Sequence, residues 1–247
     1  KVSDFIADIL VEEGVKHVFA VSGGASLHLI HSIADNPNIS HICNHQEQAS
    51  AMAADSYSRV TGNIGVAMAT SGPGATNLIT GICCSYYDSV PTLLITGNAS
   101  TKRQTGSTGV RQIGFQETPI VEVVKSITKY TNSITDPNDI EYELKKAIHI
   151  AKSGRPGPVL IDIPKLWASE CEYPIPLGLN VVRRSFSTQE QQEISQLIKS
   201  SINYALSNID LALDYSMKFG RGVSRDIAKE FVLMYVNSDT LDINFRG

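Results

Sequence analysis

The chain has 247 residues, 42% of them hydrophobic and 19% charged, a composition typical of a folded globular protein and unlike that of disordered, fibrous or disulfide-scaffold chains. This length allows one large domain, or one domain with a substantial extra piece. The formal net charge of -4 provides no basic surface to attract phosphates, which argues against a nucleic-acid partner.

The cellular location is predicted from the first residues and from hydropathy. No apolar run approaches the roughly 18 residues that suggest a membrane span, and residues 1–4 (KVSD) lead into a helical pattern rather than a signal peptide. We therefore expect a cytoplasmic protein with no membrane partner. Because the chain starts with Lys1 and not Met, we also expect a trimmed chain or a fragment.

The cysteines indicate neither a disulfide framework nor a zinc site. There are four, with no CxxC pair and no Cys and His at zinc-binding spacing: Cys43, Cys83, Cys84 and Cys171. In a cytoplasmic protein such residues are typically reduced. We expect buried free thiols and no metal ligands.

Helical and strand patterns alternate in the first part of the chain. Residues 4–13 predict a helix that Ser3 caps and Gly14 closes. Short apolar runs, each followed by turn residues, then predict buried strands at 18–21, 64–69, 93–96 and 159–163. Runs of this kind between helices indicate an α/β fold with a doubly wound parallel sheet covered on both faces.

The last third of the chain has a different composition. All 10 prolines and all 6 histidines lie within residues 1–180. The pattern of residues 183–247 predicts helices and no strand. Ser187 is predicted to cap the first of these helices, and two more are predicted at 209–219 and 224–235. We expect a domain at 1–170, a linker at 171–182 and a helical segment at 183–247 that is too narrowly apolar to form a core alone.

Two glycine-rich turns follow predicted strands. Gly72, Pro73 and Gly74 connect a strand to a helix, which is where open α/β sheets bind ligands, and Gly23 and Gly24 form a similar turn after the first strand. The turn at Gly72 lacks the Gly-Lys-Ser/Thr of a Walker loop, and Asn77 stands where a dinucleotide fingerprint has its third glycine. Each turn can serve packing alone or contact a ligand.

Glu47 is predicted to lie at the start of a helix whose residues 49–54 are small and closely packed. A carboxylate in a first turn is stabilised by the helix dipole, which is one explanation for it. The other is an acid that hydrogen-bonds a heterocycle nitrogen and shares its proton. His45 has no partner at ligand spacing, so a metal role is not expected.

Residues 153–158 (SGRPGP) end a helix and enter a strand. Arg155 in this loop can bind a ligand phosphate or bond nearby carbonyl groups, and spacing alone does not choose between the two.

In combination these segments resemble a known family. Residues 5–165 are similar to the N-terminal pyrimidine-binding domain of thiamine-diphosphate enzymes, and among them to the acetolactate synthase family. The stretches that carry the resemblance are 53–62 (AADSYSRVTG), 70–78 (TSGPGATNL), 88–91 (DSVP), 115–117 (FQE), 127–129 (ITK) and 153–159 (SGRPGPV).

The resemblance implies a mechanism and a set of site residues. Pyruvate would be decarboxylated and condensed with a second 2-oxoacid, as in branched-chain amino acid biosynthesis, with Glu47 hydrogen-bonding the aminopyrimidine ring of the cofactor. The turn residues Gly72, Pro73, Gly74 and Asn77 would line the pyrimidine, and Gly23 and Gly24 would approach the reacting centre.

Further positions are implied by the same resemblance. Phe115, Gln116 and Lys129 would border the substrate channel, and Arg155 matches an arginine that contacts FAD in the flavin-bearing members. A homodimer or tetramer is implied, because the pyrimidine domain of one subunit meets the diphosphate-binding domain of another.

Three departures from the family pattern affect these expectations. Gln46 stands where the family usually has His before the glutamate, and the loop 102–114 is longer than usual. The Gly-Asp-Gly motif that holds Mg²⁺ and the diphosphate occurs nowhere in the sequence. We therefore expect Mg²⁺ to be held by a domain absent here, and the isolated chain to bind the cofactor weakly without turnover.

Residues 183–247 resemble other proteins, the C-terminal helices of menaquinone-biosynthesis enzymes of the futalosine route. No catalytic residue of that family can be placed on them. The chain therefore reads as a natural fusion, a chimera or a fragment. Two alternative functions stay open, a non-catalytic dimerisation or binding module and a piece of a menaquinone-biosynthesis enzyme.

Overall fold

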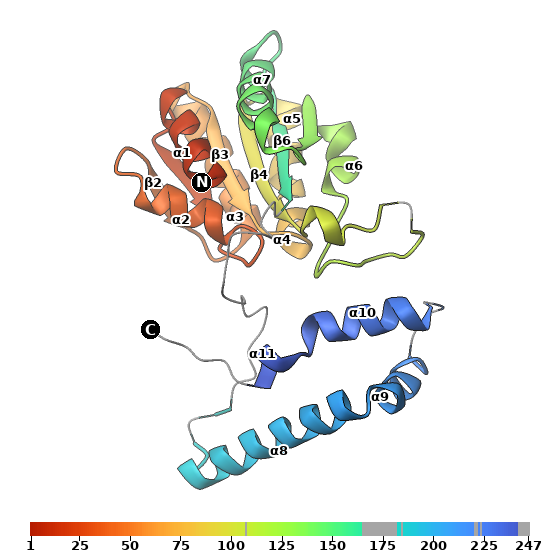
Figure 1. The fold of residues 1–247 in the computed structure, drawn as a ribbon. Helices are drawn as coiled ribbons and strands as arrows, with labels where there is room; N and C mark the ends of the chain where they lie inside the picture. Colours follow the sequence, from red (N-terminus) through yellow and green to blue (C-terminus); the bar gives the residue numbers. More distant parts are fainter. Residues whose placement is uncertain (107, 165–181, 184, 220–221, 223, 242–247) are drawn as a thin grey trace. The chain divides into compact units, whose positions relative to one another are not determined.

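The computed structural model describes the chain except for residues 107, 165–181, 184, 220, 221, 223 and 242–247 (Figure 1). The chain divides into two compact units, Lys1–Glu170 and Cys171–Gly247. Most of the predicted linker at 171–182 lies outside the described residues.

The first unit is built on a six-stranded sheet with the order β2-β1-β3-β4-β6-β5. Every pair of neighbouring strands is parallel. The strands are β1 His17–Ala20, β2 Ser40–Cys43, β3 Gly65–Ala69, β4 Thr92–Asn98, β5 Tyr130–Ser133 and β6 Val159–Pro164. The expected α/β fold with a doubly wound parallel sheet is thus confirmed.

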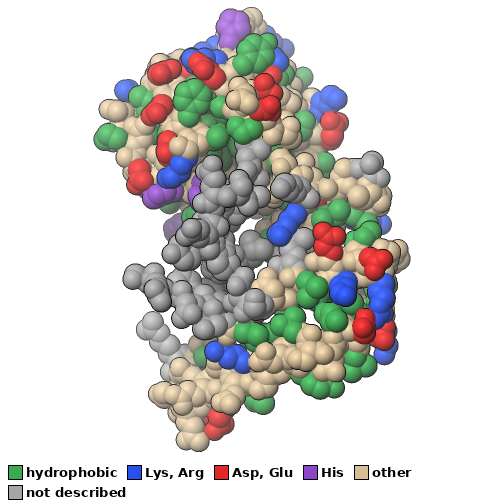
Figure 2. Space-filling view, in the orientation of Figure 1, with side chains coloured by type: hydrophobic (Ala, Val, Ile, Leu, Met, Phe, Trp, Pro, Cys, Tyr) green, Lys and Arg blue, Asp and Glu red, His purple; other side chains and the backbone are tan. Residues whose placement is uncertain are grey.

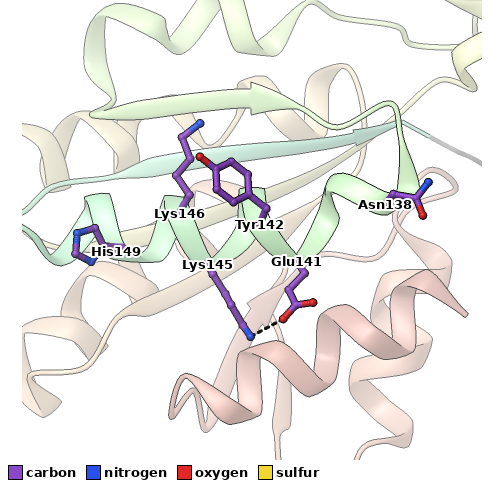
Figure 3. A pocket seen from close by; sticks show the side chains of 6 residues that line it. All are labelled: Asn138, Glu141, Tyr142, Lys145, Lys146 and His149. Atoms are coloured by element: carbon purple, nitrogen blue, oxygen red, sulfur yellow. Dashed lines mark hydrogen bonds and ion pairs between the residues drawn. The ribbon is translucent and has the colours of Figure 1, made fainter.

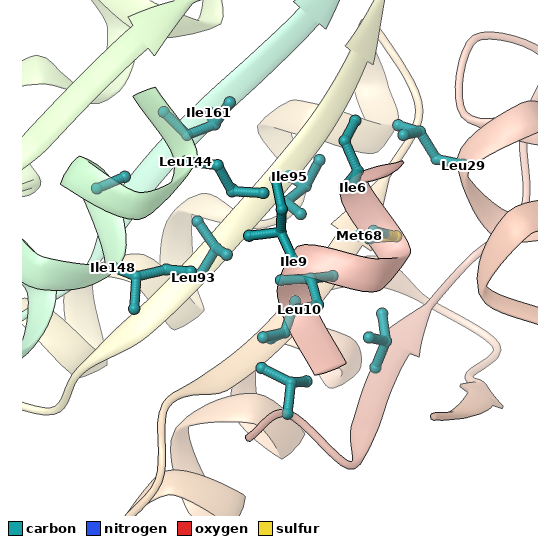
Figure 4. Packing of buried hydrophobic residues seen from close by; sticks show 14 of the residues in the cluster. Ile6, Ile9, Leu10, Leu29, Met68, Leu93, Ile95, Leu144, Ile148 and Ile161 are labelled. Atoms are coloured by element: carbon teal, nitrogen blue, oxygen red, sulfur yellow. The ribbon is translucent and has the colours of Figure 1, made fainter. Parts of the chain in front are cut away.

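Seven α-helices are described in this unit and cover both faces of its sheet (Figure 1). They are α1 Val2–Glu12, α2 Leu27–Asp35, α3 Glu47–Thr61, α4 Pro73–Thr76, α5 Ile79–Asp88, α6 Ile120–Val124 and α7 Ile140–Lys152. Side chains from α1, α2 and α7 form one buried cluster with the sheet (Figure 4). Those from α3, α5 and α6 form a second cluster on the other face. Since both faces are covered, β3, β4 and β6 are buried along their whole length.

Helix α3 lies unusually close to its neighbours because two glycines face it. A β-carbon on Gly65 would lie 1.9 Å from the backbone oxygen of Ala54, and one on Gly81 would lie 2.3 Å from the β-carbon of Ala51. The predicted close packing of residues 49–54 is confirmed for Ser50, Ala51 and Ala54, which are buried, whereas Ala49 and Met52 are exposed.

Two expectations for the first unit differ from the structure. Helix α1 begins at Val2 with Lys1 as its N-cap, so the predicted cap at Ser3 is wrong. Ser3 lies inside the helix as its second residue, and its buried hydroxyl accepts a hydrogen bond from that of Ser32 at 2.8 Å. Strand β5 was not predicted, because its sequence (YTNS) is polar and only half-buried at the edge of the sheet.

The second unit is helical in its described residues, as expected, with α8 Thr188–Ser207, α9 Ile209–Ser216, α10 Arg225–Tyr235 and α11 Ser238–Leu241. Ser187 caps α8 with Glu190, which confirms the predicted cap. Leu213 is the one buried hydrophobic residue among those described here, and apolar side chains such as Leu197 and Phe219 are exposed. Figure 2 shows hydrophobic side chains in green on the surface of the molecule.

The cysteine prediction is only partly correct. Cys43, Cys83 and Cys84 are free thiols, but Cys43 is exposed and the other two are half-buried. Cys43 is exposed because it ends the edge strand β2, where all four residues are exposed. Cys171 lies outside the described residues. Among the described helices, none combines the length and hydropathy needed to cross a bilayer.

We predict that Gly65→Ala lowers the free energy of unfolding of the first unit by about 2–3 kcal/mol, because the new methyl group overlaps the backbone of α3. Urea unfolding followed by far-UV circular dichroism measures this change. Gly24→Ala is the matched control, since a β-carbon there meets no atom within 4 Å and Gly24 has no positive φ. Equal unfolding midpoints for the two variants would contradict the prediction.

Candidate functional site

The strand order places a switch point between β1 and β3. The chain passes from β1 to β2 on one side and then crosses to β3 on the other side of β1. In open α/β sheets, ligands bind outside the carboxyl ends of the strands at such a point. The turns that carry Gly23 and Gly72 directly follow β1 and β3, so they flank this switch point.

Glu47 lies at the same edge, as the first residue of α3. The side chain of Gln46 accepts a hydrogen bond from the backbone N–H of Ala49 at 3.1 Å and thereby caps the helix. The half-buried Glu47 accepts a hydrogen bond on Oε2 from Nδ2 of Asn77 at 2.9 Å. Its Oε1 faces Gly74, where a β-carbon would lie 3.4 Å away. The structure thus brings Glu47, Gly74 and Asn77 together, a contact that the helix dipole alone does not explain.

Thr70 joins the two glycine turns, and the sequence analysis missed it. Its Oγ1 accepts a hydrogen bond from the backbone N–H of Ala25 at 3.1 Å. A β-carbon on Gly23 would lie 2.4 Å from Cβ of Thr70, and one on Gly74 would lie 2.7 Å from its Cγ2. Both glycines are therefore required by the same side chain. Its position between β3 and a glycine turn was the available signal.

Gln116 packs against the turn after β3. Gly72 has a φ of 62° and Gln116 a φ of 55°, both in the left-handed region. A β-carbon on Gly72 would lie 2.7 Å from Cβ of Gln116 and 2.8 Å from its backbone oxygen. Phe115, beside it, is 49% exposed. The loop after β4 therefore brings Phe115 and Gln116 to the edge that carries Glu47, and Figure 1 shows α4 and this loop at the same end of the sheet.

Glu117 holds this loop in shape and was also missed. Its Oε1 accepts from the backbone N–H and the hydroxyl of Thr105, at 2.6 and 2.9 Å. Its Oε2 accepts from the backbone N–H groups of Ile113 and Gly114, at 3.1 and 3.3 Å. Such pairing across a loop has no sequence signature, because it depends on the fold of the residues between.

Lys129 and Arg155 precede β5 and β6, so they lie at the amino ends of the strands. Glu47 and the glycine turns lie at the opposite, carboxyl ends. Nζ of Lys129 donates to the backbone oxygens of Ile150 and Ser153, at 2.5 and 2.6 Å, and burial lowers the pKa of its ammonium group. Nε of Arg155 donates to the hydroxyl of Ser89 at 2.6 Å. The structure does not bring these two residues to Glu47, and within this chain both bond protein groups. Their assignment to a channel and to FAD stays a prediction.

The remaining predicted residues have simpler surroundings. Gly24 would admit a β-carbon without contact, and Pro73 is the first residue of α4. His45 is exposed. In the described part of the chain, no group of three or more His, Cys, Asp or Glu side chains is placed to hold a metal ion.

A surface depression lies away from this edge, on the outer side of α7 (Figure 3). It is lined by Asn138, Glu141, Tyr142, Lys145, Lys146 and His149. Nζ of Lys145 is 2.7 Å from Oε1 of Glu141, an ordinary pair of exposed charges one helical turn apart. None of its lining residues belongs to the group formed by Glu47, Gly74 and Asn77, and we assign no chemistry to the depression.

We predict that Thr70→Val accelerates hydrogen exchange of the Ala25 amide about fivefold, because the variant keeps the shape of the side chain but loses a hydrogen bond worth about 1 kcal/mol. Amide exchange followed by NMR measures this rate. Thr70→Ser is the control, since it keeps Oγ1. If both variants exchange at the native rate, Thr70 does not join the two turns.

Two family models match the chain. Residues 1–123 match "Thiamine pyrophosphate enzyme, N-terminal TPP binding domain", and residues 146–247 match "Menaquinone biosynthesis". The second match begins within α7 and includes β6, so it starts well before the resemblance expected from residue 183 onward.

Curated relatives match about two thirds of the chain. Acetolactate synthase 2, chloroplastic, of Nicotiana tabacum is 46% identical over 165 residues, which are 67% of this chain and 24% of the relative. Acetolactate synthase 1, chloroplastic, of Zea mays is 47% identical over 163 residues, 64% of this chain and 25% of the relative. The acetolactate synthase large subunit of Pyropia yezoensis is 45% identical over 163 residues, which are 65% of this chain and 27% of the relative. The chain thus spans about a quarter of the length of these relatives. Residues 1–123 thus match the N-terminal TPP-binding domain family of the thiamine pyrophosphate enzymes, and about two thirds of the chain is similar to part of acetolactate synthases.

Proposed function

We propose that the first unit is the pyrimidine-binding part of a thiamine-diphosphate-dependent enzyme of acetolactate synthase type that acts on 2-oxoacids such as pyruvate. The observation that carries the proposal is the placement of Glu47 and Asn77 beside Gly74 at the switch point of the sheet. The family match of residues 1–123 and the identity to acetolactate synthases support it.

The residues present fit the pyrimidine half of this cofactor. Thr70 fills the space beside Gly23 and Gly74, so the absence of a side chain at both glycines lets the two turns lie close together at the switch point. Asn77 occupies Oε2 of Glu47, which leaves Oε1, the oxygen nearest Gly74, to hold a proton shared with a ring nitrogen. When bound, thiamine diphosphate supplies the electron sink for the decarboxylation of a 2-oxoacid.

Among the described residues, no group of three or more His, Cys, Asp or Glu side chains is placed to hold a metal ion, and the sequence lacks the Gly-Asp-Gly motif that the resemblance assigns to Mg²⁺ and the diphosphate. We infer that Mg²⁺ and the diphosphate are bound by another part of the enzyme, in a homodimer or tetramer. FAD binding at Arg155 and a cytoplasmic location belong to the same proposal.

A second candidate function concerns the other end of the chain. The match of residues 146–247 to a menaquinone-biosynthesis family supports a role of this segment in that process. Its helices α8 to α10 expose large apolar side chains, so we propose that the segment acts only when packed against further protein. We assign no catalytic residue to it.

Glu47→Gln should weaken binding of thiamine by about tenfold, or ~1.4 kcal/mol, because a charged acceptor is replaced by a neutral one. Titration of the full chain with thiamine, followed through the NMR signals of the Gly74 and Asn77 amides, measures the Kd. Glu122→Gln is the control, an exposed acid on α6 whose loss should leave the Kd unchanged. Equal affinity of both variants, or no shift of these signals, would contradict the pyrimidine site and favour a non-catalytic dimerisation or binding module.

The chain alone is expected to give no acetolactate when mixed with thiamine diphosphate, Mg²⁺ and pyruvate, since its sequence lacks the Gly-Asp-Gly motif expected to hold Mg²⁺ and the diphosphate. A colorimetric assay for acetolactate over several hours tests this. Product formation would show that the chain is sufficient for catalysis, and would contradict the assignment of diphosphate binding to another part of the enzyme.

A further inference from the structure

Asp162 is a buried carboxylate that the proposed function does not use. It lies in β6 and is 2% exposed. It accepts hydrogen bonds from the hydroxyl of Thr96 at 2.7 Å, the amide of Asn98 at 2.9 Å and the hydroxyl of Ser133 at 3.1 Å. Burial raises the pKa of this carboxyl group, and the hydrogen bonds oppose that effect in part. All three donors are neutral, so the carboxylate is costly for the core and calls for an explanation.

Asn98, the last residue of β4, connects this carboxylate to the loop 99–119. Its Nδ2 donates to Oδ2 of Asp162 and also to the backbone oxygen of Thr118, at 3.2 Å. Its Oδ1 accepts from the backbone N–H of Ala99 at 2.8 Å. One amide group therefore bonds both ends of the loop, and the contact with Asp162 determines which way the amide faces.

The same loop delivers Gln116 to the candidate site. Thr118, held by Asn98, lies two residues from Gln116, whose backbone packs on Gly72. Between them Glu117 closes the loop internally through four hydrogen bonds. A chain of direct contacts thus runs from the sheet interior through Asn98 to the turn beside Glu47.

We propose that Asp162 is a positioning residue that fixes the base of the loop 99–119 through Asn98, so that Gln116 closes over the Gly72 turn and forms one wall of the site. The contacts described above support the placement of the loop. Its importance for the 2-oxoacid site rests on the proposed function.

The test uses the ligand-free full chain and hydrogen exchange of the loop amides, with Glu117 and Gly114 as reporters. Asp162→Ala should accelerate their exchange about tenfold, as expected when the buried amide of Asn98 loses its acceptor and a local opening unit is destabilised. Asp162→Asn should restore the native rate within about twofold, because its oxygen can accept from Asn98 and its amino group can donate to Thr96. If instead the negative charge itself stabilised the core, Asp162→Asn would not restore the native exchange rate.

Two further variants keep the proposal testable if Asp162→Ala does not fold. Asn98→Ala removes the connection but leaves Thr96 and Ser133 on the carboxylate, and should loosen the loop as strongly. Thr92→Val, at the other end of β4, removes a buried hydroxyl that has no hydrogen-bond partner among the described residues, and should leave the loop unchanged. Native loop exchange in Asn98→Ala, or equal acceleration throughout β4 and β6, would overturn the proposal.

Thiamine binding is measured separately on the same variants. If the loop loosens in Asp162→Ala and the thiamine signals at Gly74 weaken with it, the positioning role extends to the site. If the loop loosens but thiamine binds to none of the proteins, the proposed function fails while the placement of the loop by Asp162 stands.

Discussion

The close approach of α3 to the sheet determines where the candidate site lies. Because Gly65 carries no side chain, the backbone of α3 at Ala54 rests directly on β3, and Gly81 admits the side chain of Ala51 from the other side. A helix seated at this depth has little freedom to slide along its axis. Its first residue, Glu47, is therefore held at the carboxyl edge of the sheet by contacts in the middle of the helix.

Polar contacts also hold α3 in this position. Asp55, which is buried, accepts a hydrogen bond from the hydroxyl of Ser85 at 2.8 Å and pairs with Arg59, which also reaches Asp88. These groups connect α3 to α5 near the far end of both helices. The carboxylate at one end of α3 and the ion pairs near the other end thus belong to one helix, which these pairs hold against α5.

Much of the fold was predictable because its signals are local. Buried strands such as β3 and β4 appear as apolar runs, and the turns that follow them contain the glycines that close approach requires. The grouping of Glu47 with Gly74 followed from the family resemblance. By contrast, Thr70 and Glu117 depend on partners 45 and up to 12 residues away, and no periodicity indicates such pairs. Lys129 and Arg155 were grouped with the site by resemblance, although strand direction alone places them at the amino edge.

The hydrogen bonding of β6 shows which structural unit holds the start of the second family match. The menaquinone-biosynthesis match begins at Lys146 and so includes this strand. Yet β6 pairs with β4 on one side and β5 on the other, and it contributes Leu160 and Ile161 to the two clusters on opposite faces of the sheet. Removal of β6 would expose both clusters and leave β5 without a neighbour in the sheet. The physical boundary therefore falls after Pro164, whatever the ancestry of the residues before it, and Asp162 belongs to the unit that carries Glu47.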